Sequence, residues 1–482
     1  MRVSQFYNLS KTQPSLPFLD VDIRNDVKLF VNARAINNLN SEWGDHCQDL
    51  LQDFFAELLG AIKGGKNGRA LDLLSHLKEP NETHLGLSKG ESDGRGLGLE
   101  KAKQIWRSFR SSKAVKTGLL TDLEDTVLLI DGISVDILSD IITNIIRGPL
   151  ISFTQTTCGE YGIPLAQDVV SGPVWNMRTK KWDNDYVSLP MPNDGKLLLV
   201  PKSIIRLDMD YNISTYYRHY VLEKLKEEEK EKNSNLVHIL KTGKRKGEKK
   251  VYKTDLMAKY GEQEKAVSIE QTDRHPDILK KYKADNANPT PALSHRQIAD
   301  AEGTEPPDWE KLLNAVLKLE PGKKQAYQYE DAIVDLMYAL FYPVLVNPET
   351  QTPIHDGLKR VDITFTNYAR SGFFEWLARH YQSPYVFIEC KNFGSEIGNP
   401  EIDQIAMRLA KQRGQFGMIV CRKVENRAKM LKRCQGAAKD GHGYVLVLDD
   451  EDLQRLVMEA KVEFPGTYEF PTLQEKFKEL VF

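Results

Sequence analysis

Residues 385–391 read Tyr-Val-Phe-Ile-Glu-Cys-Lys, an apolar run that ends in charged residues. An apolar run of this length is typical of a strand that is buried on both faces of a sheet. Side chains alternate along a strand, so Glu389 and Lys391 share one face while Cys390 lies on the other. Unpaired charge at the end of a buried strand is costly. We therefore expect these residues to have charged partners or to bind an ion.

The segments on both sides of this strand alternate between helix and strand patterns. Helices are predicted at residues 309–319, 329–341, 373–380, 401–412, 425–438 and from 451 onward, and strands at 344–346, 360–366, 416–421 and 444–448. Alternating strands and helices predict an α/β fold in which helices cover both faces of a sheet. We assign residues 309–482 to this domain.

The rest of the chain is long enough for further domains, because 482 residues exceed what one hydrophobic core usually serves. Residues 1–210 predict an N-terminal α/β domain of recognition or regulation. Its expected helices are 41–62, 99–109 and one from 135 to a stop at Gly148-Pro149, and its expected strands are 29–34, 127–130 and 197–200, with a glycine-rich loop at 86–98. Residues 211–308 predict a charged, mostly helical connector, with a helix at 222–232 and a basic run at 241–250.

Composition narrows the function classes. The net charge is -2, so nucleic-acid contacts must come from local basic patches. No apolar run reaches the ~18 residues of a membrane helix, and the N-terminus lacks a signal-peptide pattern. The five cysteines are widely spaced without a C-x-x-C pair, which argues against a disulfide framework or a structural zinc site. We expect a cytoplasmic protein with no membrane contact.

Asp362 stands in a second strand pattern and could share a divalent cation with Glu389. Carboxylate ligands without a His or Cys cluster favour Mg²⁺, with Mn²⁺ as an alternative, over zinc. Such an ion polarises a phosphoryl oxygen and acidifies a bound water. The ammonium group of Lys391 can orient that water and neutralise charge that develops on the phosphate. Phosphodiester hydrolysis is the reaction that uses all three groups.

Asp362, followed 27 positions later by Glu389-Cys390-Lys391, resembles the PD-(D/E)xK restriction-endonuclease-like superfamily, and its Mrr-like branch in particular. The resemblance covers about the C-terminal third of the chain and implies a mixed central sheet flanked by helices. Val361 stands where the motif has proline. The resemblance also implies that Glu330 is an additional carboxylate, that Gln404 faces the site, and that the Cys390 carbonyl joins Asp362, Glu389 and Glu330 at the metal.

The implied function is a Mg²⁺-dependent DNA endonuclease, in restriction or anti-phage defence. One such site cuts one strand, so a homodimer is expected for cutting a duplex, and the N-terminal domain could receive a protein or ligand trigger. A repair or recombination nuclease, a nucleic-acid-binding protein that does not cut, and an RNA nuclease are the alternatives. No RNA-recognition signature supports the last of these.

Residues 391–433 contain ten basic and four acidic residues, a local balance of +6. Beside a phosphodiesterase site these residues could track the DNA backbone. The expected contacts are Arg408, Lys411, Arg413, Arg422 and Lys423. The competing interpretations are a solvated helix face for this basic set, an ordinary same-face pair for Glu389 and Lys391, and surface positions for Glu330 and Gln404.

Overall fold

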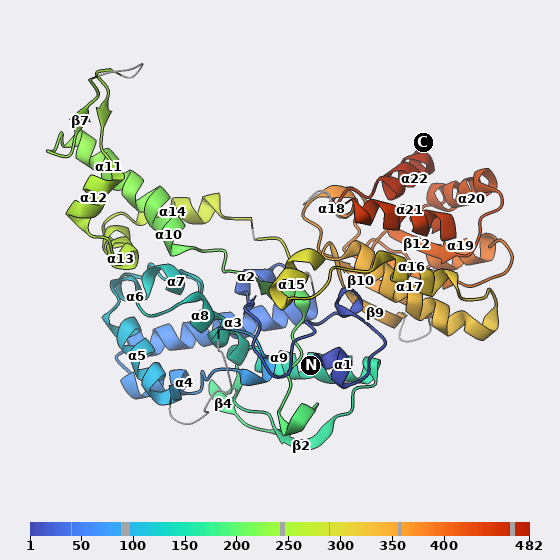
Figure 1. Cartoon of the computed structure of the whole chain (residues 1–482), viewed down its shortest axis with the longest axis horizontal. Helices are drawn as coiled ribbons and strands as arrows, with labels where there is room; N and C mark the ends of the chain where they lie inside the picture. Colours follow the sequence, from blue (N-terminus) through green and yellow to red (C-terminus); the bar gives the residue numbers. More distant parts are fainter. Residues whose placement is uncertain (40, 88–96, 242–245, 289, 355–358, 463–467) are drawn as a thin grey trace.

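The computed structural model describes residues 1–39, 41–87, 97–241, 246–288, 290–354, 359–462 and 468–482. The chain is elongated, with the C-terminal sheet at one end of the long axis and the helices around α12 at the other (Figure 1). Most of the glycine-rich segment 86–98 lies outside the described residues. Within the described part of the chain, no helix is both long and apolar enough to cross a membrane.

A mixed five-stranded sheet organises the C-terminal region, in the order β13-β12-β11-β10-β9. Strand β10 is antiparallel to both of its neighbours, β9 and β11. Strands β11, β12 and β13 are parallel to one another. The strands are β9 (Leu345–Ile354), β10 (Lys359–Asn367), β11 (Tyr385–Lys391), β12 (Phe416–Cys421) and β13 (Tyr444–Leu448). The predicted bounds of β11, β12 and β13 are confirmed, and β9 is longer than predicted.

Helices connect these strands and pack on them. They are α16 (Trp309–Leu317), α17 (Ala326–Phe341), α18 (Gly372–Tyr381), α19 (Asn399–Ala406), α20 (Arg427–Lys439), α21 (Asp450–Lys461) and α22 (Pro471–Val481). Helix α17 contacts β9 and β11, and it also packs on α16 and α21. Helices α19, α20 and α22 contact β13. The mixed α/β class is therefore confirmed, and α22 was not predicted.

Helix α19 ends six residues before its predicted end, and the reason is a tight turn. The backbone of Ala410 pairs with Gly414, whose φ is +136°. A Cβ atom on Gly414 would lie 2.6 Å from the Tyr385 carbonyl oxygen, so glycine is required where this turn meets the start of β11. The turn redirects the chain after α19.

The N-terminal region is mainly helical, with three two-stranded pairs in place of one large sheet among its described residues. Its helices are α1 (Val3–Phe6), α2 (Ala33–Asn37), α3 (Glu42–Lys63), α4 (Asn67–Ser75), α5 (Leu97–Ser111), α6 (Lys113–Thr117), α7 (Asp125–Leu129), α8 (Val135–Ile145) and α9 (Arg147–Tyr161). The strand pairs are β1 (Phe30–Val31) with β6 (Ile205–Arg206), β2 (Ala166–Val170) with β5 (Tyr186–Leu189), and β3 (Val174–Asn176) with β4 (Lys181–Asp183).

Three predictions for this region are wrong in part. The apolar segment 127–130 is not a strand, because it lies in the buried helix α7, and a short apolar run does not distinguish the two. Residues 197–200 are buried but belong to no strand. The helix expected from 135 ends at Ile145, before Gly148-Pro149 as predicted, but this pair does not stop helix formation, because α9 begins at Arg147 and takes Pro149 into its first turn, where a missing N–H is tolerated.

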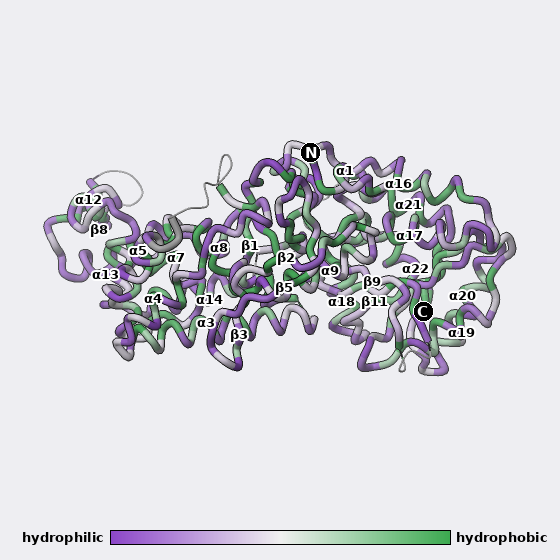
Figure 2. Tube along the Cα trace, turned by 90° about the horizontal axis from the view of Figure 1, so that it is seen from below, coloured by the Kyte–Doolittle hydropathy of each residue, from purple (hydrophilic) through white to green (hydrophobic). Residues whose placement is uncertain are grey.

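The connector is helical, as predicted. It contains α10 (Ile213–Tyr216), a π-helical turn (Tyr217–Val221), α11 (Leu222–Glu231), α12 (Lys253–Tyr260), α13 (Glu264–Arg274), α14 (Pro276–Asp285) and α15 (His295–Glu302). A two-stranded hairpin of β7 (His238–Ile239) and β8 (Lys249–Lys250) interrupts it between α11 and α12. The hydropathy trace is green through the interior and largely purple around α12 and α13 (Figure 2).

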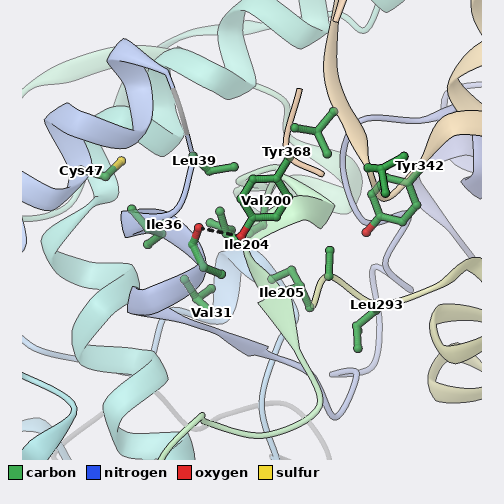
Figure 3. Packing of buried hydrophobic residues seen from close by; sticks show 14 of the residues in the cluster. Val31, Ile36, Leu39, Cys47, Val200, Ile204, Ile205, Leu293, Tyr342 and Tyr368 are labelled. Carbon is green, nitrogen blue, oxygen red and sulfur yellow. Dashed lines mark hydrogen bonds between the residues drawn. The ribbon is translucent and has the colours of Figure 1, made fainter. Parts of the chain in front are cut away.

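One continuous hydrophobic core joins the N-terminal and C-terminal regions. Figure 3 shows Ile36 and Ile204 of the N-terminal region packing near Tyr368, which follows β10. The Tyr368 hydroxyl donates to the Ala35 carbonyl at 3.5 Å. The two regions therefore share buried surface.

A buried lysine crosses the same junction. Lys202 is fully buried, and its Nζ lies 4.1 Å and 4.2 Å from the ring centroids of Tyr338 and Tyr342. The same ammonium group donates to the carbonyls of Gln13 and Pro14 at 3.2 Å and 2.9 Å. Because a buried ammonium needs such partners, the aromatic rings at the end of α17 stabilise a side chain of the N-terminal region.

Candidate functional site

The site is built where β10 and β11 meet. The two strands are antiparallel, with Ile363 opposite Ile388, so Asp362 and Glu389 follow at the same end of the ladder. Asp362 Oδ2 accepts a hydrogen bond from the Cys390 backbone N–H at 2.8 Å. A side chain of one strand therefore binds the backbone of the other, and this contact fixes Asp362 beside the Glu389-Cys390-Lys391 triplet.

Glu389 is the most deeply buried member of the site, with no exposed surface. Lys391 Nζ donates to Glu389 Oε2 at 3.1 Å, which agrees with the expected shared face. The guanidinium of Arg408, from the turn after α19, forms an ion pair with Glu389 Oε1. Two cations therefore compensate one buried carboxylate, and the expectation that charge at this strand end has charged partners is confirmed.

Glu330 approaches from α17 and is half-buried. Its Oε1 accepts a hydrogen bond from the Gln351 side chain of β9 at 2.6 Å. Burial raises the pKa of Glu330, and the neighbouring negative charge of Asp362 adds to this shift. The backbone of Gln351 has φ +52°, a left-handed conformation that costs a non-glycine residue about 1 kcal/mol. No sequence pattern predicted a role for Gln351.

Asn392 fixes the approach of α17 to the strand end. Its side-chain amide donates to the carbonyls of Glu320 and Gly322 at 3.0 Å and 3.1 Å. Its backbone carbonyl accepts from the Gly322 N–H at 2.7 Å. The loop before α17 is thus held by the residue that directly follows Lys391. We did not predict this role, although the position next to the E-x-K triplet was a usable signal.

The five expected DNA contacts occupy three kinds of position. Lys411 and Lys423 are exposed. Arg413 is half-buried and donates to the Arg408 carbonyl at 3.4 Å. Arg408 and Arg422 are buried at their guanidinium ends, with side chains 9% exposed. In this conformation the last two are engaged in ion pairs within the protein, and their role in DNA binding stays a prediction.

Arg422 has a structural task. It donates to the carbonyls of Val316 and Leu317, the last residues of α16, at 2.9 Å and 3.3 Å. It also pairs with Asp450 at 3.2 Å, and its guanidinium lies 5.2 Å from the Tyr329 ring centroid. Because the last carbonyls of a helix lack partners within the helix, Arg422 stabilises the end of α16.

Gln404 is exposed on α19 and, within the described part of the chain, forms no hydrogen bond with Glu389, Asp362 or Lys391. An exposed position is what the surface interpretation expects, and a role of Gln404 beside the carboxylates stays a prediction. Arg408, four residues later, is the α19-side residue that reaches Glu389.

The donor set can be compared with the needs of a divalent cation. Asp362, Glu389 and the Cys390 carbonyl offer oxygen atoms only, which suits Mg²⁺ or Mn²⁺. Among the residues that the structure describes, no three His, Cys, Asp or Glu side chains are close enough together to hold a metal ion. Glu330 therefore lies near Asp362 and Glu389 but does not form a three-carboxylate metal site with them in this conformation. The residues fit a cation held by two carboxylates and one carbonyl, with water completing the coordination.

Comparison with known proteins bears on the other end of the chain. Residues 8–212 match the model of a domain of unknown function, DUF8370, which covers less than half of the chain. No curated protein and no solved structure matches the sequence.

Proposed function

We propose that the C-terminal region is a metal-dependent nuclease that hydrolyses phosphodiester bonds in DNA. The observation that carries the proposal is the meeting of Asp362, Glu389 and Lys391 at one end of the β10–β11 ladder. Glu389 is fully buried there, and its charge is compensated by Lys391 and Arg408, which could exchange for another cation. The resemblance of this triplet to the PD-(D/E)xK pattern supports the same reading.

In this proposal Asp362, Glu389 and the Cys390 carbonyl hold the divalent cation. The bound cation would polarise the phosphate and acidify a water molecule. Lys391 neutralises charge on the phosphate and donates a hydrogen bond to the attacking water. Asn392 and Gln351 act as positioning residues, since the first fixes the loop before α17 and the second holds Glu330.

Arg408 defines what has to change before a cation can bind. Its guanidinium pairs with Glu389 Oε1, so a cation that binds Glu389 would share this carboxylate with Arg408 or displace it. A displaced guanidinium would become available to a DNA phosphate. Lys411 and Lys423, already exposed, supply further phosphate contacts.

The N-terminal region contacts the helix that carries Glu330. Lys11 forms ion pairs with Asp331 and Asp335 of α17 at 2.9 Å and 2.7 Å. Asp331 is the residue next to Glu330, so a ligand or partner that moves Lys11 would act on the helix that carries Glu330. We propose that residues 8–212 regulate or direct the nuclease, and that two chains act together on duplex DNA.

Plasmid cleavage with Mg²⁺ tests the proposal. Asp362→Ala and Lys391→Ala should each lower the cleavage rate at least about a hundredfold, because each removes charge stabilisation at the reacting phosphate. Asp403→Ala and Lys439→Ala are matched controls, since both residues lie in helices of the same domain outside the site. Cleavage that survives the first two substitutions would move the active site elsewhere.

The Arg408–Glu389 pair also favours a second candidate, a protein that binds nucleic acid without cutting it. If the guanidinium holds Glu389 permanently, no cation enters. This candidate predicts that wild type leaves DNA intact with Mg²⁺ and Mn²⁺ yet retains it in a salt-sensitive manner, with the Lys391→Ala variant retaining it equally well. Metal-dependent cleavage by wild type would exclude it.

A further inference from the structure

The β7–β8 hairpin is a basic surface that the nuclease site does not use. Residues 241–250 contain six basic residues and one acidic residue. Of the basic residues that the structure describes here, Lys241, Lys246, Lys249 and Lys250 are all exposed. None of these four lysines forms an ion pair with the described part of the chain. Their positive charge is therefore open to an external partner.

The acidic residues beneath the hairpin do not cancel this charge, because most of them are already paired with other cations. Glu223 pairs with Lys226 at 2.8 Å, and Glu229 pairs with Lys259 at 2.6 Å. Asp255 accepts from His238 at 2.9 Å. Positive charge thus concentrates at the hairpin, in a chain whose net charge is -2.

Exposed rings and apolar atoms accompany the lysines. Tyr252 is 40% exposed and Ile239 is 62% exposed. Lys250 Nζ lies 4.5 Å above the Tyr252 ring centroid, and the His238 ring meets the same tyrosine edge-on at 5.2 Å. An aromatic ring beside lysines can pack on a sugar or a base while the ammonium groups contact phosphates.

The shape of the hairpin also suits a nucleic acid. His238 pairs with Lys250 and Ile239 with Lys249, so a lysine lies on each face of the ribbon. A two-stranded antiparallel ribbon fits the major groove of duplex DNA, with lysines reaching the phosphates on either side. In Figure 1 the hairpin projects from the α11–α12 end of the molecule, away from the sheet β9–β13, and its described residues are exposed.

We infer that the β7–β8 hairpin is a second, sequence-independent binding site for duplex DNA, separate from the proposed nuclease site. Lys241, Lys246, Lys249 and Lys250 bind backbone phosphates, and Tyr252 packs against the backbone or a base edge. This inference does not rest on nuclease activity, because binding here needs neither a metal nor the carboxylates of the sheet.

The test measures the affinity of the full chain for a fluorescent duplex of random sequence, by anisotropy in EDTA. The variant Lys249→Glu/Lys250→Glu should bind at least about tenfold more weakly than wild type, and the slope of log affinity against log salt should fall by about 2, one for each lost phosphate contact. Lys280→Glu/Lys281→Glu is the matched control, because it reverses an adjacent, exposed lysine pair on α14.

Three results would overturn the inference. One is equal affinity of the hairpin variant and the control variant. Another is displacement of the duplex by poly-glutamate at the same charge concentration, which would indicate an acidic protein as the ligand. The third is equally tight binding to vesicles of anionic lipid. Unchanged melting temperatures would verify that both variants fold, as expected for exposed side chains.

Discussion

The two ends of the molecule use positive charge in opposite ways. At the sheet β9–β13, Arg408 and Arg422 point inward, where the first pairs with Glu389 and the second completes the end of α16. At the β7–β8 hairpin, four exposed lysines form no ion pair with the described part of the chain. Both ends are rich in basic residues, but the guanidinium groups of Arg408 and Arg422 are engaged within the fold, whereas the ammonium groups of the hairpin lysines are open to an external partner. Burial and partners decide which charges stabilise the fold and which bind ligands.

The largest test of this comparison removes the inward charge beside Glu389. Arg408→Met should lower the free energy of unfolding by about 3–5 kcal/mol, because it leaves the fully buried carboxylate of Glu389 with Lys391 as its one ion-pair partner among the described residues. Urea unfolding in EDTA measures the loss, and Mg²⁺ should restore part of it if a cation replaces the guanidinium.

Arg455→Met is the control for that measurement. Arg455 pairs with Glu475 at the surface, where both side chains are at least half exposed, so its loss should cost less than about 1 kcal/mol. Similar losses in the free energy of unfolding for the two variants would contradict the conclusion that the buried pair of Arg408 with Glu389 contributes more to stability than a surface pair.

A smaller effect is expected at Arg422. Arg422→Met should cost about 2 kcal/mol of stability, because the carbonyls of Val316 and Leu317 lose their donor and Asp450 loses its partner. DNA affinity should remain within twofold of wild type, as measured by anisotropy in EDTA. A tenfold loss of DNA affinity with an unchanged free energy of unfolding would instead indicate that Arg422 contacts DNA.

The exposed lysines near the site should behave in the reverse manner. Lys411→Glu/Lys423→Glu should weaken duplex binding about tenfold and leave the free energy of unfolding within about 0.5 kcal/mol of wild type. Gel retention at two salt concentrations and urea unfolding give the two quantities. A clear loss in the free energy of unfolding with unchanged duplex affinity would indicate that these lysines stabilise the fold, as Arg408 and Arg422 do.

The smallest effect concerns a buried acidic residue at the junction of the two regions. Burial raises the pKa of Glu302 to about 7, against the nearby charge of Arg2. A carboxyl whose pKa is raised on folding stabilises the protein most below its unfolded pKa, near 4.5, and that stability is lost as pH rises toward 7. The urea midpoint should therefore fall between pH 5 and pH 8 less steeply in Glu302→Gln than in wild type. Glu305→Gln, at an exposed position, should keep the wild-type slope.

Local patterns sufficed for the elements that carry the site. Strand β11 is so apolar that only a buried strand accommodates it, and the charges at its end predicted partners that the structure contains. The apolar pattern of residues 127–130 predicted a strand, but these residues lie in the buried helix α7, because buried helices and buried strands both contain short apolar runs. Arg408 was recognised as basic, but its ion pair with Glu389 is a tertiary contact that no local pattern encodes.

The packing of Lys202 against Tyr338 and Tyr342 limits how the sequences of related chains can evolve. The ammonium group comes from the N-terminal region, whereas Tyr338 and Tyr342 belong to the C-terminal region. A recombination event that exchanged one region alone would leave either a buried ammonium without its two aromatic rings or two rings without their cation. Related chains should therefore inherit both regions together, and replacement of the lysine should be accompanied by replacement of one of the tyrosines.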